Sequence, residues 1–138
     1  MGNLGGQTPL MFAARGGHLE VVTYLLSHGS QLETTDEWGR TPLMFAAERG
    51  HLEVVTYLIS HGSQLEATDP YGRTPLMFAA MGGHLEVVTF LVSHGSQLEA
   101  TDRDGQTALH WAAQYGGIDV TKWLLDQGCS PWVKTKKE

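Results

Sequence analysis

The chain has 138 residues, of which 41% are hydrophobic, and a formal net charge of −6 from nine Lys and Arg against fifteen Asp and Glu. This length predicts one soluble globular domain, and no apolar run approaches the roughly 20 residues that cross a bilayer, which argues against a membrane role. The negative charge would not attract a phosphate backbone, so nucleic acid is an unfavourable partner and another protein fits better.

The sequence repeats itself every 33 residues. TPLMFAA begins at Thr8, Thr41 and Thr74, and TALHWAA begins at Thr107, so four units occupy about residues 6–38, 39–71, 72–104 and 105–137. The segments 39–71 and 72–104 differ at only six of their 33 positions. Self-similarity at a fixed period of this size predicts a single domain built from stacked units.

Each unit is predicted to contain two short helices, as the second unit illustrates. Thr41 suits an N-cap, Pro42 suits the first helical turn, and Gly50 ends the first helix. A second helix follows from His51 and stops at Gly62. Helices of about ten residues are marginal alone, so their stability has to come from stacking one pair on the next.

Turns are predicted between the pairs, at residues 36–39, 69–72 and 102–105, where the pattern is Asp-x-x-Gly. The Asp side chain can accept hydrogen bonds from backbone N–H groups ahead of it, and Gly tolerates a positive φ. The two residues between them lie at the tip of the turn. Folding constrains the sequence least at such surface positions.

The unit D-x-x-G-x-T-P-L-x-x-A-A-x-x-G-H-L-E-V-V-x-x-L-x-x-x-G resembles the ankyrin repeat over about residues 6–133, less fully in the last unit. The resemblance implies an all-α solenoid of four helix-turn-helix units with β-turn or hairpin tips, and a concave groove that binds other proteins. The near-identity of the units further resembles designed ankyrin repeat proteins built on a consensus scaffold.

The chain departs from the family pattern in several places, one of which is Gly-Ser-Gln-Leu-Glu in place of the usual Gly-Ala-Asp-Val-Asn. Met11, Met44 and Met77 stand where the family usually has His, which only His110 keeps. The last unit is more polar on its second helix, as a terminal cap requires. The first unit lacks its turn, so we expect its outer face to be poorly capped.

The candidate partner-binding residues are those that vary between units without a packing reason. They lie at the tips and at the ends of the first helices, and they are Glu37, Trp38, Pro70, Tyr71, Arg103 and Asp104, with Arg15, Glu48, Arg49, Met81, Gly82, Gln114 and Tyr115. Trp38, Tyr71 and Tyr115 are the strongest candidates, because large amphipathic rings dominate interface energetics. The alternative is tolerated drift in loops. Drift would also have changed the Ser-His-Gly-Ser-Gln segments, which are identical in the first three units.

Two rows of aromatic residues recur with the repeat. Phe12, Phe45, Phe78 and Trp111 follow the Met or His position, and the sequence leaves open whether they line the groove, as candidate partner contacts, or wedge between units. On the second helix, the recurring aromatic residues are interpreted as packing residues; they are Tyr24, Tyr57, Phe90 and Trp123.

No catalytic site or metal site is predicted. The seven histidines recur with the repeat, and the two in each of the first three units lie about 15 Å apart along a helix, too far for shared zinc ligation. Stacked histidines of adjacent units would be the only possible cluster. Cys129 has no partner for an internal disulfide, and we expect a partly buried small side chain, with a reactive thiol as the alternative.

The sequence therefore predicts a binding module without catalysis or cofactor, monomeric on its own, and most similar to an engineered binder. The alternatives are a consensus scaffold without a partner and a fragment of a natural ankyrin protein, with an enzyme last. The cellular location is not encoded; independence from a disulfide is compatible with the cytoplasm, and a synthetic origin is an alternative.

Overall fold

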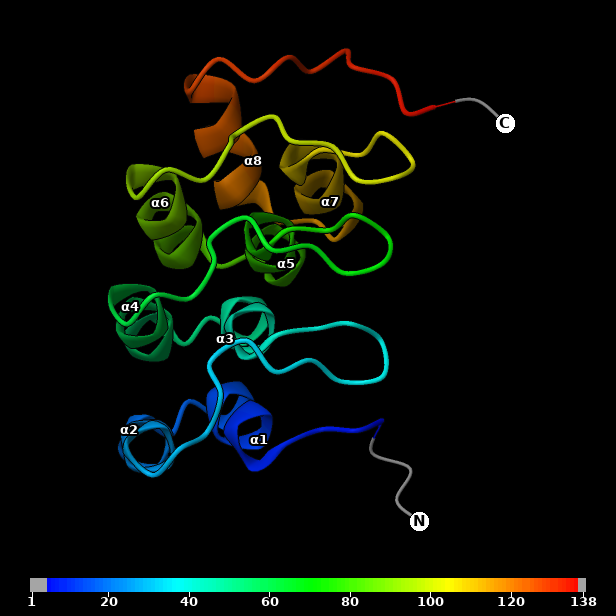
Figure 1. The fold of residues 1–138 in the computed structure, drawn as a ribbon. Helices are drawn as coiled ribbons and strands as arrows, with labels where there is room; N and C mark the ends of the chain where they lie inside the picture. The colour runs from blue at the N-terminus through cyan, green and yellow to red at the C-terminus, as the bar shows by residue number, and fades with distance from the viewer. Residues whose placement is uncertain (1–4, 137–138) are drawn as a thin grey trace.

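The first and second helices of the units form two separate layers. The computed structural model describes residues 5–136, in which all eight regular elements are α-helices and no strand occurs. One layer holds the first helices, and the other holds the second helices (Figure 1). The bounds of the first layer are α1 Pro9–Gly16, α3 Pro42–Arg49, α5 Pro75–Gly82 and α7 Ala108–Gln114. Those of the second are α2 Leu19–Ser27, α4 Leu52–Ser60, α6 Leu85–Ser93 and α8 Ile118–Asp126.

The helix ends follow the sequence signals closely. The Thr41 hydroxyl accepts a hydrogen bond from the backbone N–H of Met44 at 3.3 Å, and Pro42 occupies the first helical position. Gly50 adopts a φ of 77°, a left-handed conformation that ends α3 at little steric cost. The helices are seven to nine residues long, slightly shorter than predicted.

Methionine replaces histidine at the helix start without loss of the cap. The Sδ atom of Met44 accepts a hydrogen bond from the N–H of Thr41 at 3.4 Å. In the last unit, Nδ1 of His110 accepts from the N–H of Thr107 at 3.0 Å, and its Nε2 lies 2.9 Å from the carbonyl oxygen of Val133. Met11, Met44 and Met77 are at most 1% exposed, so all three provide packing, and Met44 adds the bond through its sulfur.

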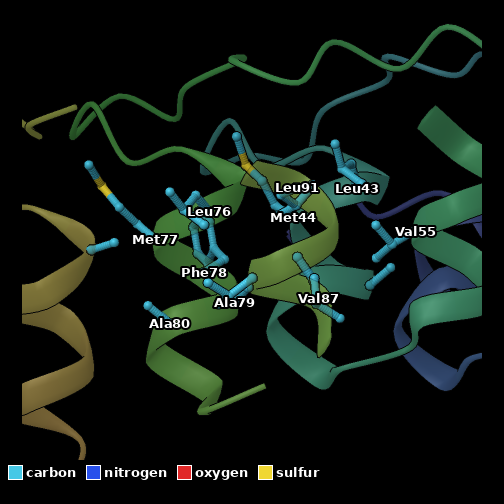
Figure 2. Packing of buried hydrophobic residues seen from close by; sticks show 14 of the residues in the cluster. Leu43, Met44, Val55, Leu76, Met77, Phe78, Ala79, Ala80, Val87 and Leu91 are labelled. Carbon is cyan, nitrogen blue, oxygen red and sulfur yellow. The ribbon is translucent and has the colours of Figure 1, made fainter. Parts of the chain in front are cut away.

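The core runs the length of the stack between the two layers. Figure 2 shows Leu43, Val55, Leu76, Val87 and Leu91 meeting there from four helices. All five are at most 2% exposed. The same figure shows Ala79 and Ala80 on α5, where the small side chains let neighbouring first helices approach closely.

The two ends of the stack differ. Val54 in the second unit is fully buried, whereas its equivalent in the first unit, Val21, is 48% exposed because no described residue covers that face. At the other end, residues 130–136 lie across the last unit, and α8 exposes Lys122 and Asp126 to solvent. Among the described residues, no helix has the length and apolar character needed to cross a membrane.

Replacing Leu58 with Ala tests the interior of the stack. Leu58 is fully buried on α4, so Leu58→Ala should lower the free energy of unfolding by about 3 kcal/mol. Its half-buried neighbour Ile59 is the matched control, and Ile59→Ala should cost less than half as much. Urea denaturation followed by circular dichroism measures both; equal losses would contradict the packing described here.

Candidate functional site

Each turn is held by one buried aspartate. Oδ1 of Asp36 accepts hydrogen bonds from the backbone N–H groups of Trp38 at 3.0 Å and Arg40 at 2.9 Å. Its Oδ2 pairs with the Arg40 guanidinium, 2.9 Å from Nη2, while the Asp36 side chain is inaccessible to solvent. Asp69 and Asp102 repeat the backbone contacts in the next two turns. The turn is thus closed from inside, and its two central residues face outward.

All six central residues of the turns are exposed, as the candidate surface requires. Trp38 is 50% exposed and Tyr71 is 60% exposed, which is unusual for rings of this size. Part of the Trp38 ring packs on Gly5, where any Cβ atom would overlap the ring. Trp38 is therefore both displayed and held in place.

The variable residues at the ends of the first helices fall into two groups. Arg49, Gly82, Gln114 and Tyr115 are exposed, and Tyr115 has 58% of its surface accessible. Arg15, Glu48 and Met81 are partly buried, and Met81 also packs against the core. The first group adjoins solvent directly, while the second presents only part of each side chain.

The aromatic row on the first helices is packed between units, one of the two roles that the sequence left open. Phe45, Phe78 and Trp111 are 4%, 3% and 9% exposed, so they retain little area for a partner, although they were candidate contacts. The indole N–H of Trp111 also donates to Oδ2 of Asp102 at 3.2 Å. Phe12 differs at 41% exposure, because it belongs to the uncovered first unit.

The sequence comparison missed Arg40 and Arg73, because they are identical in two units and vary only in the first and last. The Arg40 guanidinium lies over the rings of Phe45 at 4.8 Å and Trp38 at 5.3 Å. Arg73 lies over Tyr71 at 5.2 Å and likewise over the buried aromatic row. A cation on a ring face orients both groups. Each arginine thus links the displayed ring of its turn to the aromatic row below.

Backbone hydrogen bonds join neighbouring tips. The N–H of Arg103 donates to the carbonyl oxygen of Tyr71 at 2.9 Å, and the N–H of Lys136 donates to that of Asp104 at the same distance. The equivalent bond to Trp38 is missing, because Pro70 has no N–H. The side chains of residues 134–136 are exposed, but the backbone of Lys136 is bound to the last tip.

The described residues offer little for chemistry. Across residues 5–136, no group of three or more His, Cys, Asp or Glu side chains is arranged to hold a metal ion. Cys129 is 6% exposed, and burial together with the nearby Glu99 charge raises the pKa of its thiol. A raised pKa reduces the thiolate fraction at neutral pH, and the side chain belongs to the buried core.

The family model described as "Ankyrin repeats (3 copies)" matches the chain twice, over residues 1–69 and over residues 62–135. None of the curated proteins matches the chain. The two matched ranges together cover all eight helices of the structure.

Removing one of the buried aspartates tests how the turns are held. Asp69→Ala leaves two backbone N–H groups and the Arg73 guanidinium without their acceptor, so we expect a loss of about 3 kcal/mol in unfolding free energy. The control is the exposed Asp104→Ala, which should change stability by less than about 0.5 kcal/mol. Thermal and urea denaturation distinguish the two variants. A small effect of Asp69→Ala would show that the turn is held by other contacts.

The dependence of stability on pH below neutrality tests the lowered pKa of Asp36. Burial alone would raise the pKa of Asp36, but hydrogen bonds from Arg40 and Trp38 and the Arg40 charge outweigh it, so the pKa lies below its usual 3.8. A lowered folded-state pKa stabilises the fold above about pH 4, and this contribution is lost as the pH falls through the folded-state pKa. The stability difference between the wild type and Asp36→Asn should therefore shrink between pH 6 and pH 2 in urea titrations. A difference that is constant with pH would refute this assignment.

Proposed function

Because the chain belongs to the ankyrin repeat family, whose members generally act as protein-interaction modules, we propose that its turn tips and first-helix ends bind a folded protein. Members of the family are typically not enzymes, and the proposal assigns this chain a binding role without catalysis. The observation that carries the proposal is the exposure of Trp38, Tyr71 and Tyr115 at the tips and first-helix ends; within residues 39–104, Tyr71 is the only large hydrophobic side chain that is exposed.

The energetics of protein interfaces favour this surface. Trp, Tyr and Arg are the residues that most often dominate binding free energy when a partner covers them. Here the rings of Trp38 and Tyr71 are pre-oriented by Arg40 and Arg73, so little side-chain entropy remains to be lost on binding. An interface of standard size would bury about 800 Å² on this side.

The distribution of sequence change supports an engineered origin. Residues 39–71 and 72–104 differ at six positions, and four of these, at 48, 49, 70 and 71, are either tips or first-helix ends. Such a pattern fits a consensus scaffold with a diversified binding surface. A consensus scaffold without any partner and a fragment of a natural ankyrin protein remain the competing proposals.

A reciprocal exchange between two turns tests the binding proposal. In the variant, Glu37 and Trp38 change places with Arg103 and Asp104, which leaves the composition and the turn frame unchanged. Affinity capture from a lysate followed by mass spectrometry identifies a partner of the wild-type chain. Calorimetry should then show an affinity loss of at least about tenfold in the exchange variant, with a melting temperature within a few degrees of the wild type.

Single substitutions refine the same measurement. Tyr71→Ala should weaken binding by about 1–2 kcal/mol or more. Tyr24→Ala is the matched control, since Tyr24 is 64% exposed on α2 in the other helix layer and should leave the affinity unchanged. An equal loss from both variants would place the interface elsewhere, and the lack of any partner for the wild type would favour the scaffold.

A further inference from the structure

The end of the first unit that no residue of the described range 5–136 covers contains an apolar hollow. Its volume is about 600 Å³, and it is formed mainly by Pro9, Phe12, Val21 and Leu25. The polar side chains that line it are Gln7 and His18, and no carboxylate, lysine or arginine is among the lining residues. A hollow of this size accommodates a large apolar side chain of a partner.

Arg15 stands beside this hollow. Its guanidinium lies over the ring of Phe12 at 5.4 Å and over the ring of Phe45 at 4.8 Å. Phe12 thus contributes to both features, since its ring also lines the hollow. The guanidinium thus adjoins two aromatic rings, and its N–H groups make no hydrogen bond to a described residue, which leaves them for another acceptor.

Arg15 differs from the other arginines because its guanidinium lies over aromatic rings but has no hydrogen-bond or ion-pair partner among the described residues. Arg40 and Arg73 are each paired with a buried aspartate, and Arg103 donates to the carbonyl oxygen of Pro70. Among the described residues, no carboxylate lies within 4.0 Å of the Arg15 guanidinium, and its N–H groups make no hydrogen bond. Arg49 is also unpaired, but it lies over no ring and is exposed.

We propose that the Arg15 guanidinium and the adjacent hollow bind a segment of a partner protein in which a carboxylate side chain neighbours a large apolar one. The carboxylate accepts the two parallel N–H bonds of the guanidinium, and the apolar side chain fills the hollow. This inference rests on the proposed function, because it takes the chain as a protein-binding module, and it adds the chemistry of one contact.

The charges of the chain favour a carboxylate over a phosphate. A phosphate dianion is bound best by a cluster of cations, whereas Arg40 is already neutralised and Glu48 occupies the position equivalent to Arg15 in the next unit. The net charge of −6 also opposes a highly anionic partner such as a phosphorylated segment. A single carboxylate within an apolar contact matches one oriented guanidinium.

A second copy of this chain is the competing occupant. Ile118 is 60% exposed, and the exposed Asp119 follows it at the start of α8, so this pair has the required chemistry. Sedimentation velocity at protein concentrations up to roughly 200 μM tests for such a dimer, since a weak dimer needs only a modest interface. Self-association that both Arg15→Gln and Asp119→Asn abolish would assign the site to a second copy and overturn the proposal.

Selection from a phage-displayed library of random dodecapeptides on the full chain tests the chemistry. The enriched peptides should carry Asp or Glu within two residues of Leu, Ile or Phe. For the best peptide, anisotropy titration should show about tenfold weaker binding to Arg15→Gln and a smaller loss for Arg15→Lys, which keeps the charge but not the planar fork. Arg49→Gln is the matched control and should bind like the wild type.

A double-mutant cycle makes the test specific. Changing the peptide's acid to its amide should weaken binding to the wild type by about tenfold and hardly affect binding to Arg15→Gln, because the two changes remove the same contact. Equal losses on both proteins, enriched peptides without an acid, or no enrichment would overturn the inference. Peptides that lose affinity for the turn-exchange variant but not for Arg15→Gln would overturn this inference alone and leave the proposed function standing.

Discussion

Burial of the interior first helices, α3 and α5, between their neighbours is the constraint on which the rest of the structure depends. On α3 and α5, the pairs Ala46–Ala47 and Ala79–Ala80 have no solvent exposure, and larger side chains there would force the helices apart. A helix of eight residues is not stable alone, so it exists because this contact is made on both sides. The positions at the end of the helix and on the preceding turn do not take part in this packing, so their side chains can vary.

The repeat made most of the fold predictable. The Thr cap, the Pro in the first helical turn and the Gly at the helix end are local signals, and each of them repeats, so an error in one unit would have shown in the others. The stacking of the helix pairs was also predictable, because helices this short are not stable without packing against neighbours. The ends of the stack were harder, since the backbone contact of Lys136 with Asp104 depends on tertiary position and on no local pattern.

The candidate site was predicted by variation between units. This signal cannot identify functional residues that are the same in adjacent units. It pointed to Trp38, Tyr71 and Tyr115, which the structure displays on the surface. It could not reveal Arg40 and Arg73, because a residue repeated in adjacent units looks like scaffold even when it adjoins the candidate surface. Nor could it settle the role of Phe45, since an aromatic ring at a helix start suits both a groove and a core; only its neighbours decide between them.

The missing N–H of Pro70 divides the row of tips into two separately connected parts. One part joins Gly5 to the turn of Trp38 by a backbone bond, and the other joins Tyr71 through Arg103 and Asp104 to Lys136. Between them, the ring of Pro70 rests against Gly39 with packing alone. Apolar contact is non-directional, so it fixes the relative position of two turns less tightly than a hydrogen bond does. We therefore expect the row of tips to deform most readily between the turns of Trp38 and Tyr71, midway along the surface that carries the displayed rings.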